Sequence, residues 1–203
     1  MGFQTPARRA EHEDVVKGSR FIALAQHLPH LDALEALLDE RRRALDGASH
    51  HVWGMRWGET LRSSDDGEPG GTAGRPVLEV VLKRDLDRVV VVVTRYFGGT
   101  KLGAGGLARA YGAAAARALD AAGVRLVEDR ERWRARLPYA AVDVVVRHAT
   151  DDRAIMRVAT DYDAAGPIVT LEVRSADAER WLALLADLTR GQAALIERAT
   201  LDA

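Results

Sequence analysis

The chain has 203 residues, of which 29 are Lys or Arg and 30 are Asp or Glu, so its formal net charge is −1. This balance excludes the overall basic excess of many nucleic-acid-binding proteins and leaves room only for a local basic patch. Cysteine is absent, which excludes disulfides, thiolate nucleophiles and cysteine-ligated metal sites. The N-terminal segment lacks the apolar core of a signal peptide, and no window approaches the roughly 18 apolar residues of a membrane span, so a soluble, cytoplasmic protein is expected.

The first part of the chain predicts strands and one amphipathic helix. In chain order we expect an irregular polar segment to about residue 15, a strand or hairpin over 15–28, a helix over 31–45, and a strand over 50–57. Lys17 and Gly18 are the candidate hairpin turn. In the helix, leucines recur on one face, and arginines follow near its C-terminal end, where the helix dipole favours cations.

The middle of the chain predicts a loop, a helix, a buried strand and a second helix. The loop covers 63–74, and the helix that follows carries Pro76 in its first turn, where a missing N–H costs little. The run of valines within 88–97 predicts a central strand. A glycine-rich segment then leads into an alanine-rich helix that is expected to end near Ala122.

Beyond the charged segment 128–132 the order of elements changes. The pattern predicts strand, helix, strand, strand, helix and strand, which is the βαββαβ order of a ferredoxin-like domain. We therefore expect an α/β chain of the α+β kind with two domains. The first would cover residues 1–130 and the second, ferredoxin-like domain residues 131–203.

The junction between the central strand and its helix is unusually rich in glycine. Backbone amides at a helix N-terminus favour an anion, and glycines let a ligand approach them. The spacing excludes a Walker loop, and the GxGxxA match over 103–108 lies too far from the strand for a dinucleotide fold. Two interpretations stay open, a phosphate-binding site for a nucleotide or an RNA backbone, and a sharp strand-to-helix turn. The residues assigned to the anion or nucleic-acid site are Arg95, Tyr96, Gly98, Gly99, Lys101, Gly103, Gly105, Gly106 and Arg109.

The loop before the first helix of this region is acidic. Asp65, Asp66 and Glu68 lie within four residues and are candidates for a hard cation or for general acid–base chemistry. The alternatives are that Asp65 or a neighbouring hydroxyl caps the following helix, or that the loop is a solvated turn. His50 and His51 are adjacent in a strand, so their side chains face opposite sides and cannot bind one metal ion.

Four motifs resemble, in order and spacing, those of the IMPACT family, whose bacterial members are often called YigZ-type. The motifs are KGSRFIA at 17–23, SHH at 49–51, SSDDGEPGGTAGRP at 63–76 and VVVTRYFGGTKLGAGGLARAYG at 91–112. The resemblance covers about residues 15–125. It implies a first domain similar to the second domain of ribosomal protein S-five, and a ferredoxin-like tail similar to the last domain of a translocating elongation factor.

The resemblance also implies which polar residues matter. The family's recurring polar positions correspond here to Ser19, Arg20, His50, Asp65, Asp66, Glu68, Thr72, Arg95, Tyr96, Lys101, Arg109 and Tyr111. Two positions depart from the family pattern. Val52 stands where a cysteine is common, so no cysteine chemistry can be essential, and His51 replaces a common asparagine.

Three functions are compatible with the sequence. The favoured one is a non-catalytic modulator of translation that binds RNA or the ribosome through the glycine-rich loop 98–106. The alternatives are an enzyme on a phosphorylated substrate, with Mg²⁺ held by Asp65, Asp66 and Glu68, and a module that docks on a translation-related protein. No catalytic residue and no cofactor are predicted for the favoured function, and the sequence does not indicate an oligomeric state.

Overall fold

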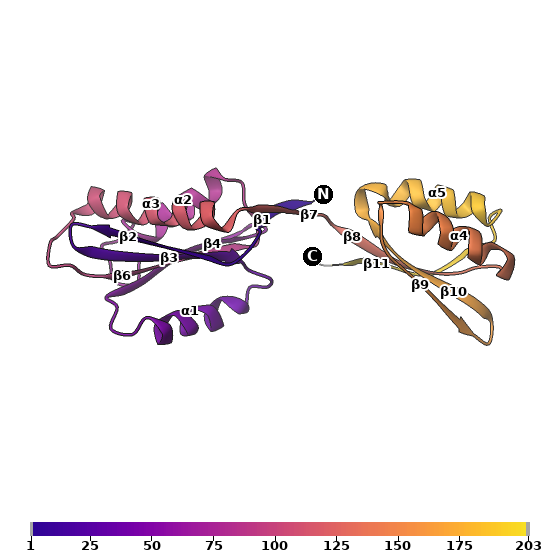
Figure 1. The fold of residues 1–203 in the computed structure, drawn as a ribbon, viewed down its shortest axis with the longest axis horizontal. Coiled ribbons are helices and arrows are strands. Elements are labelled where there is room, and N and C mark those ends of the chain that lie inside the picture. The colour runs from indigo at the N-terminus through magenta and orange to yellow at the C-terminus, as the bar shows by residue number, and fades with distance from the viewer. Residues whose placement is uncertain (1, 202–203) are drawn as a thin grey trace. The chain divides into compact units, whose positions relative to one another are not determined.

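The structure is a computed structural model that describes residues 2–201 of the chain. Its internal contacts divide the chain into two units, Phe3–Leu126 and a second unit that begins at Val127 and also includes Gly2 (Figure 1). The change of unit lies between Leu126 and Val127, whereas the sequence predicts it between residues 130 and 131. Within the described residues, no helix is long and apolar enough to cross a membrane.

The first domain contains a five-stranded antiparallel sheet with the order β2-β3-β6-β4-β5. Its strands are β2 (Ala10–Val16), β3 (Ser19–His27), β4 (His50–Trp57), β5 (Thr60–Ser64) and β6 (Val89–Tyr96). The predicted central strand is therefore β6, which pairs with β3 on one side and β4 on the other.

Three helices cover the two faces of this sheet. They are α1 (Ala33–Ala44), α2 (Gly74–Lys83) and α3 (Ala104–Ala122). Figure 1 shows α2 and α3 on one face and α1 on the other. The valines of β6 divide between the faces, because Val91 and Val93 pack in the cluster under α2 and α3, whereas Val90 and Val92 pack against α1. A strand buried on both faces needs an unbroken apolar run, which is what the sequence contains there.

Two expectations for the first domain are wrong. The N-terminal segment is not irregular, because it forms β1 (Phe3–Pro6) and then β2, an edge strand in which half-buried and exposed residues alternate. β1 pairs with β7 (Val124–Val127) in a separate two-stranded sheet. The acidic loop also begins later than expected, because residues through Ser64 pair with β4 as strand β5. Polar edge strands lack the apolar pattern on which strand prediction depends.

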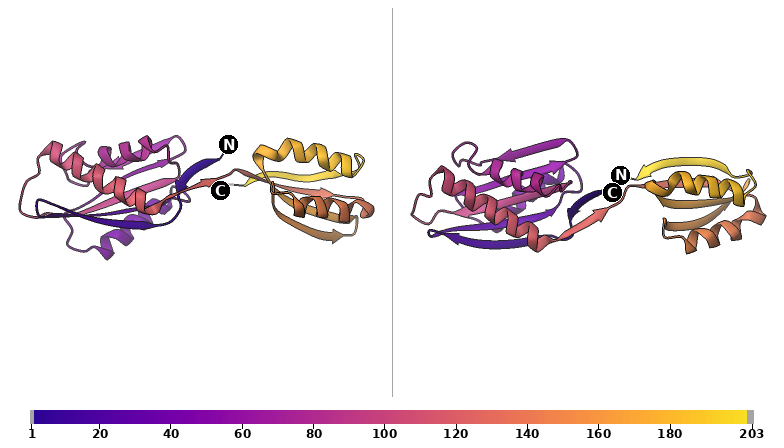
Figure 2. Two further views of the ribbon diagram at one scale, coloured as in Figure 1. Left: turned by 45° about the horizontal axis from the view of Figure 1, so that its top comes forward. Right: turned by 90° about the horizontal axis from the view of Figure 1, so that it is seen from above.

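The second domain has the predicted ferredoxin-like order. Its elements are β8 (Arg130–Arg136), α4 (Tyr139–Asp151), β9 (Ile155–Asp163), β10 (Gly166–Arg174), the short 3₁₀ helix η1 (Ser175–Asp177), α5 (Ala178–Leu188) and β11 (Ala194–Leu201). The antiparallel sheet has the order β11-β8-β10-β9, and Figure 2 shows both helices on one of its faces. Trp133 and Trp181 are fully buried in the core between the sheet and these helices.

Candidate functional site

The glycine-rich junction leaves the C-terminal end of β6, and its first glycine is required by packing. A Cβ atom at Gly98 would lie 1.9 Å from the carbonyl carbon of Gly18 and 2.0 Å from its oxygen. The two backbones therefore touch where the β2–β3 turn packs against the junction. The close backbone contact explains why residue 98 is glycine, and no ligand is needed to account for it.

Two other glycines of the junction, Gly103 and Gly105, are not crowded. Gly103 has a φ of +70°, so its conformation suits glycine, and nothing lies within 4 Å of the position of a Cβ atom. Gly105 is helical and has only the Arg109 side chain nearby, with Nη1 at 3.6 Å from that position. A helical glycine costs about 0.5–1 kcal/mol relative to alanine, so Gly105 lowers stability with no packing reason. Its effect is to leave the backbone of the first turn of α3 accessible.

The N-terminus of α3 is also electrostatically uncompensated. Its N-cap residue is Gly103, which makes no side-chain cap, and no acidic residue lies in the first turn. The first amides of a helix have no intrahelical partner, and the helix dipole favours negative charge there. Lys101 is exposed just before this turn. The arrangement can bind an anion without rearrangement of the backbone.

A cavity of about 260 Å³ lies beside this helix end, between α3 and the end of the β2–β3 hairpin. Its charged lining residues are Asp14, Lys17, Arg109 and Arg117, and Gly106 contributes backbone. Burial would raise the pKa of Asp14, but hydrogen bonds from Arg117 and His12 lower it below its ordinary value, so Asp14 stays ionised and neutralises Arg117.

Two cations of this cavity remain available. Within residues 2–201, neither Lys17 nor Arg109 has a carboxylate partner. The cavity thus joins two predicted site residues, Gly106 and Arg109, with Lys17. The sequence indicated Lys17 as a turn residue and as the start of the KGSRFIA motif, but not as a site residue. The β2–β3 hairpin places Lys17 at the same cavity as residues of α3, and no local sequence signal indicates that proximity.

Arg95 does not point to the N-terminus of α3, where the other predicted cations lie. It continues the row of β6 residues that face α2 and α3, and its side chain is 5% exposed. Its Nη1 donates to Glu68 Oε1 at 2.5 Å, and its Nη2 donates to Ser19 Oγ at 3.2 Å. Tyr96 faces the other way, and its hydroxyl donates to the carbonyl of Asp46 at 3.2 Å.

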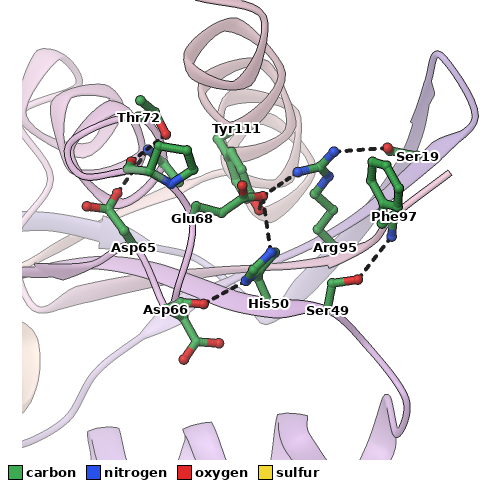
Figure 3. A network of polar contacts seen from close by, with 12 residues as sticks. Ser19, Ser49, His50, Asp65, Asp66, Glu68, Thr72, Arg95, Phe97 and Tyr111 are labelled. Atoms are coloured by element: carbon green, nitrogen blue, oxygen red, sulfur yellow. Dashed lines mark hydrogen bonds and ion pairs between the residues drawn. The ribbon is translucent and has the colours of Figure 1, made fainter. Parts of the chain in front are cut away.

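Glu68 is the centre of a buried polar network, shown in Figure 3. Its Oε1 accepts hydrogen bonds from Arg95 and from the Tyr111 hydroxyl, the latter at 2.7 Å. Burial and the Glu68 carboxylate raise the pKa of Tyr111 far above its ordinary value, so the phenol stays protonated and donates. The Ser19 hydroxyl also accepts from the amide of Gly98 at 3.2 Å. The network therefore links the acidic loop, the end of β6, α3 and the start of the glycine-rich junction.

His50 lies at the edge of this network. Its Nδ1 is 2.7 Å from the carbonyl oxygen of Asp66, so Nδ1 carries a proton, and its Nε2 is 3.9 Å from Glu68 Oε1 (Figure 3). His51 lies on the other side of the strand, as expected, with Nδ1 3.1 Å from the Thr94 hydroxyl. Burial is the main cause that lowers the pKa of His51, and it outweighs the raising effect of Asp66.

The carboxylates of the other two acidic residues, Asp65 and Asp66, accept hydrogen bonds from backbone amides. Asp65 Oδ1 accepts from the amides of Ala73 and Gly74 at 3.0 and 2.8 Å, and its Oδ2 accepts from Gly71 at 2.7 Å. Burial raises the pKa of Asp65, but these amides lower it below its ordinary value. Asp65 is thus the helix cap that the sequence left open as an alternative. Asp66 Oδ2 accepts from the amide of His51 at 2.5 Å.

The predicted site residues therefore separate into groups. Ser19, His50, Glu68, Arg95 and Tyr111 converge in the buried network, whereas Lys101, Arg109 and the open glycines surround the N-terminus of α3. Three other predicted residues lie outside both groups. The half-buried Thr72 donates to the carbonyl of Pro69. The exposed Arg20 pairs with Glu13 and lies over the ring of the half-buried Tyr96. Across the described chain, no group of three or more His, Asp or Glu residues is arranged to hold a metal ion. The carboxylates of Asp65, Asp66 and Glu68 accept hydrogen bonds from different donors.

Comparison with known proteins gives consistent matches. The sequence profile of the Impact N-terminal domain matches residues 17–119. An IMPACT family member of Thermus thermophilus is 37% identical over 183 residues, which cover 88% of this chain and 97% of the relative. YvyE of Bacillus subtilis is 42% identical over 123 residues, and YigZ of Escherichia coli is 36% identical over 121.

These last two matches span only 57% and 58% of the length of the relatives. They cover 59% and 56% of this chain. Among solved structures, a crystal structure of a hypothetical protein aligns with a TM-score of 0.69 at 28% identity, and the alignment covers 96% of each chain. That structure supports the two-domain α+β fold along the whole chain.

Proposed function

Because the chain belongs to the IMPACT family, we propose that it is a non-catalytic modulator of translation that binds RNA, on or off the ribosome, through the N-terminus of α3. The observation that carries this proposal is the open, positively charged end of α3. There, uncapped amides, the exposed Lys101 and a cavity with the unpaired Lys17 and Arg109 occur together. Phosphate groups of a nucleic-acid backbone are the anions that such a surface suits best.

The buried network supports a non-catalytic function. A catalytic carboxylate needs a substrate within hydrogen-bond reach, but Glu68 is 4% exposed and already accepts from Arg95 and Tyr111. Asp65 is likewise saturated by backbone amides. These groups fix the shape of the loop beside the junction, so the residues left for contact with a partner are those on the surface.

The proposed interface contains few cations, and their number limits the expected affinity for RNA. Lys17, Lys101 and Arg109 supply few phosphate contacts, so binding should depend moderately on salt and should not resemble the tight binding of a highly basic protein. A modulator that must leave its target needs an affinity of this kind.

The test measures binding of the full chain to a labelled single-stranded oligoribonucleotide and to purified ribosomes over a series of salt concentrations. The double variant Lys101→Ala with Arg109→Ala should weaken binding, and each lost phosphate contact should reduce the magnitude of the salt slope by about one. The charge-matched control is Arg62→Ala with Lys83→Ala, two exposed cations on β5 and α2. The proposal is overturned if both double variants bind alike, or if the first binds normally and only melts earlier.

A further inference from the structure

A second basic cavity lies elsewhere in the first domain, and the proposed function does not use it. It has a volume of about 320 Å³ and is lined by the β1–β2 connection at residues 6–9, by Gln26 and His27 at the end of β3, and by Arg125 on β7. The lining includes Arg8, Arg9, Arg125 and an imidazole, and none of the described residues that line it is acidic. Its volume lies at the lower end of the range for small-molecule pockets.

The three arginines of this cavity differ in their engagement. Arg8 donates from Nε and Nη2 to the carbonyl of Ala121, at 3.1 and 2.9 Å, so it is held at the C-terminal end of α3. Arg9 forms an ion pair with Glu40. Arg125 is exposed, and no carboxylate among residues 2–201 pairs with it. The cavity therefore has one fixed cation, one neutralised cation and one cation available to a ligand.

The hydrogen bonds of His27 define its protonation state. Its Nδ1 is 2.9 Å from the Thr5 hydroxyl, and that hydroxyl donates its single hydrogen to the carbonyl of Arg88 at 3.1 Å. The Thr5 oxygen must therefore accept from His27, so Nδ1 carries the proton and the neutral ring keeps a lone pair on Nε2. Proton uptake by His27 would occur at Nε2.

Positive charge opposes that uptake in the free protein. Burial is the largest cause that lowers the pKa of His27, and the charges of Arg125 and Arg88 lower it further. A hydrogen bond with the backbone of Arg88 acts in the opposite direction and raises this pKa. Of the other charged groups around the ring, Arg8 adds positive charge, and Arg9 is offset by Glu40. An anion bound in the cavity would reverse this balance.

We propose that this cavity is a binding site for a phosphate monoester, held by Arg125 and Arg8 and by a proton that His27 takes up at Nε2. A guanidinium pairs with two phosphate oxygens through parallel N–H groups, and a dianion compensates the excess of positive charge. Because binding favours protonated His27, affinity rises as the pH falls from about 7.5 towards 6.5, where a monoester with a second pKa near 6 is still mostly a dianion. This inference is independent of RNA binding at α3.

The phosphate monoester has two plausible sources, which the same experiment distinguishes. One is a free small molecule such as a mononucleotide, and the other is the terminal phosphate of an RNA chain. An internal phosphodiester carries one negative charge and does not match the proton uptake. The probes are therefore inorganic phosphate, adenosine 5′-monophosphate, and two oligoribonucleotides of one sequence with a 5′-phosphate or a 5′-hydroxyl end.

The readout is the pH titration of the histidine ring signals by NMR in the full chain. Saturating phosphate or the mononucleotide should raise the pKa of His27 by about one unit, while the exposed His30 and His148 serve as internal references. A small-molecule site responds to the mononucleotide and to neither oligonucleotide. A site for RNA ends responds to the 5′-phosphorylated oligonucleotide and not to its 5′-hydroxyl counterpart.

The variant Arg125→Gln provides the decisive comparison. It should raise the pKa of His27 in the free protein and weaken phosphate binding by about tenfold, because one charge-assisted contact is lost. Among residues 2–201 the side chain of Arg125 has no hydrogen-bond or ion-pair partner, so the variant should fold normally, and Lys101→Ala is the control that leaves this cavity unchanged. The proposal is overturned if no probe shifts His27, or if Arg125→Gln leaves the phosphate response as it was.

Discussion

Glu68 and Arg95 form an ion pair in the interior of the first domain, with 2.5 Å between Oε1 and Nη1 and with both side chains at most 5% exposed. The pair joins the acidic loop to the C-terminal end of the central strand β6, and Tyr111 of α3 donates to the same oxygen. Such a pair is a weak source of stability as a whole, because burial of both charges offsets their attraction. Breaking it by removing one partner is costly.

The first prediction concerns this pair. Glu68→Ala should lower the free energy of unfolding by about 3–5 kcal/mol, because Arg95 would be left buried and unpaired. Glu68→Leu combined with Arg95→Met should recover most of that loss, since no charge then stays buried. Urea unfolding followed by circular dichroism measures both. Equal losses in the single and the double variant would show that packing, and not the unpaired charge, sets the cost.

The second prediction concerns the cap of α2. Asp65→Ala should lower stability by about 1–2 kcal/mol at pH 7, because the amides of Gly71, Ala73 and Gly74 lose their acceptor. The pKa of Asp65 is lowered in the folded state, so its contribution is complete above its unfolded pKa, near 4, and disappears as the pH falls through the folded value. Unfolding at pH 7, 5 and 3 tests this, and the difference in stability between the two proteins should be smaller at pH 3 than at pH 7. A difference of the same size at both pH values would contradict the assignment.

The third prediction separates stability from binding at one position. Gly105→Ala should stabilise the protein by about 0.5–1 kcal/mol, because the first turn of α3 gains a helix former in open space. The same methyl group covers the backbone at the proposed anion site, so RNA affinity should fall. Thermal melting and RNA titration are compared on the same sample. Unchanged affinity with higher stability would leave the glycine without a binding function.

The fourth prediction concerns the contact between two turns. Gly98→Ala should prevent folding or lower stability by more than about 3 kcal/mol, because its Cβ would lie 1.9 Å from the backbone of Gly18. Gly47→Ala is the control, since nothing lies within 4 Å of that position and only its positive φ opposes the change. Near-equal melting temperatures for the two variants would show that the β2–β3 turn moves away easily.

The fifth prediction concerns the connection between the two units. Residues 128–129 lie between β7 and β8, and the side chain of Glu128 is 43% exposed. A brief digestion with a glutamate-specific protease should therefore cut after Glu128 and release two fragments that resist further cleavage. Mass spectrometry identifies the cut. Early cleavage after Glu79 in α2 or after Glu131 in β8 would contradict two separately folded units.

Sequence reasoning succeeded where the local pattern carried the information. The valines of β6 predicted a strand buried on both faces, and the βαββαβ order of the second domain followed from alternating patterns. It failed for β1, β2 and β5, because a polar edge strand has little apolar periodicity. Arg95 was assigned to the anion or nucleic-acid site, although its parity with Val91 and Val93 placed it on the face under α3. Lys17 was not predicted as a site residue, because its place beside α3 in the cavity depends on the fold.

The two-stranded sheet of β1 and β7 has a consequence for how the first domain can be rearranged. This unit starts and finishes in neighbouring strands, at Phe3 and Leu126, so its ends could be joined by a short linker. New ends opened at the exposed Gly47 would interrupt no strand or helix. The domain is therefore suited to circular permutation, and as a cassette it could be inserted into a loop of another protein without separating the strands on which its sheet depends.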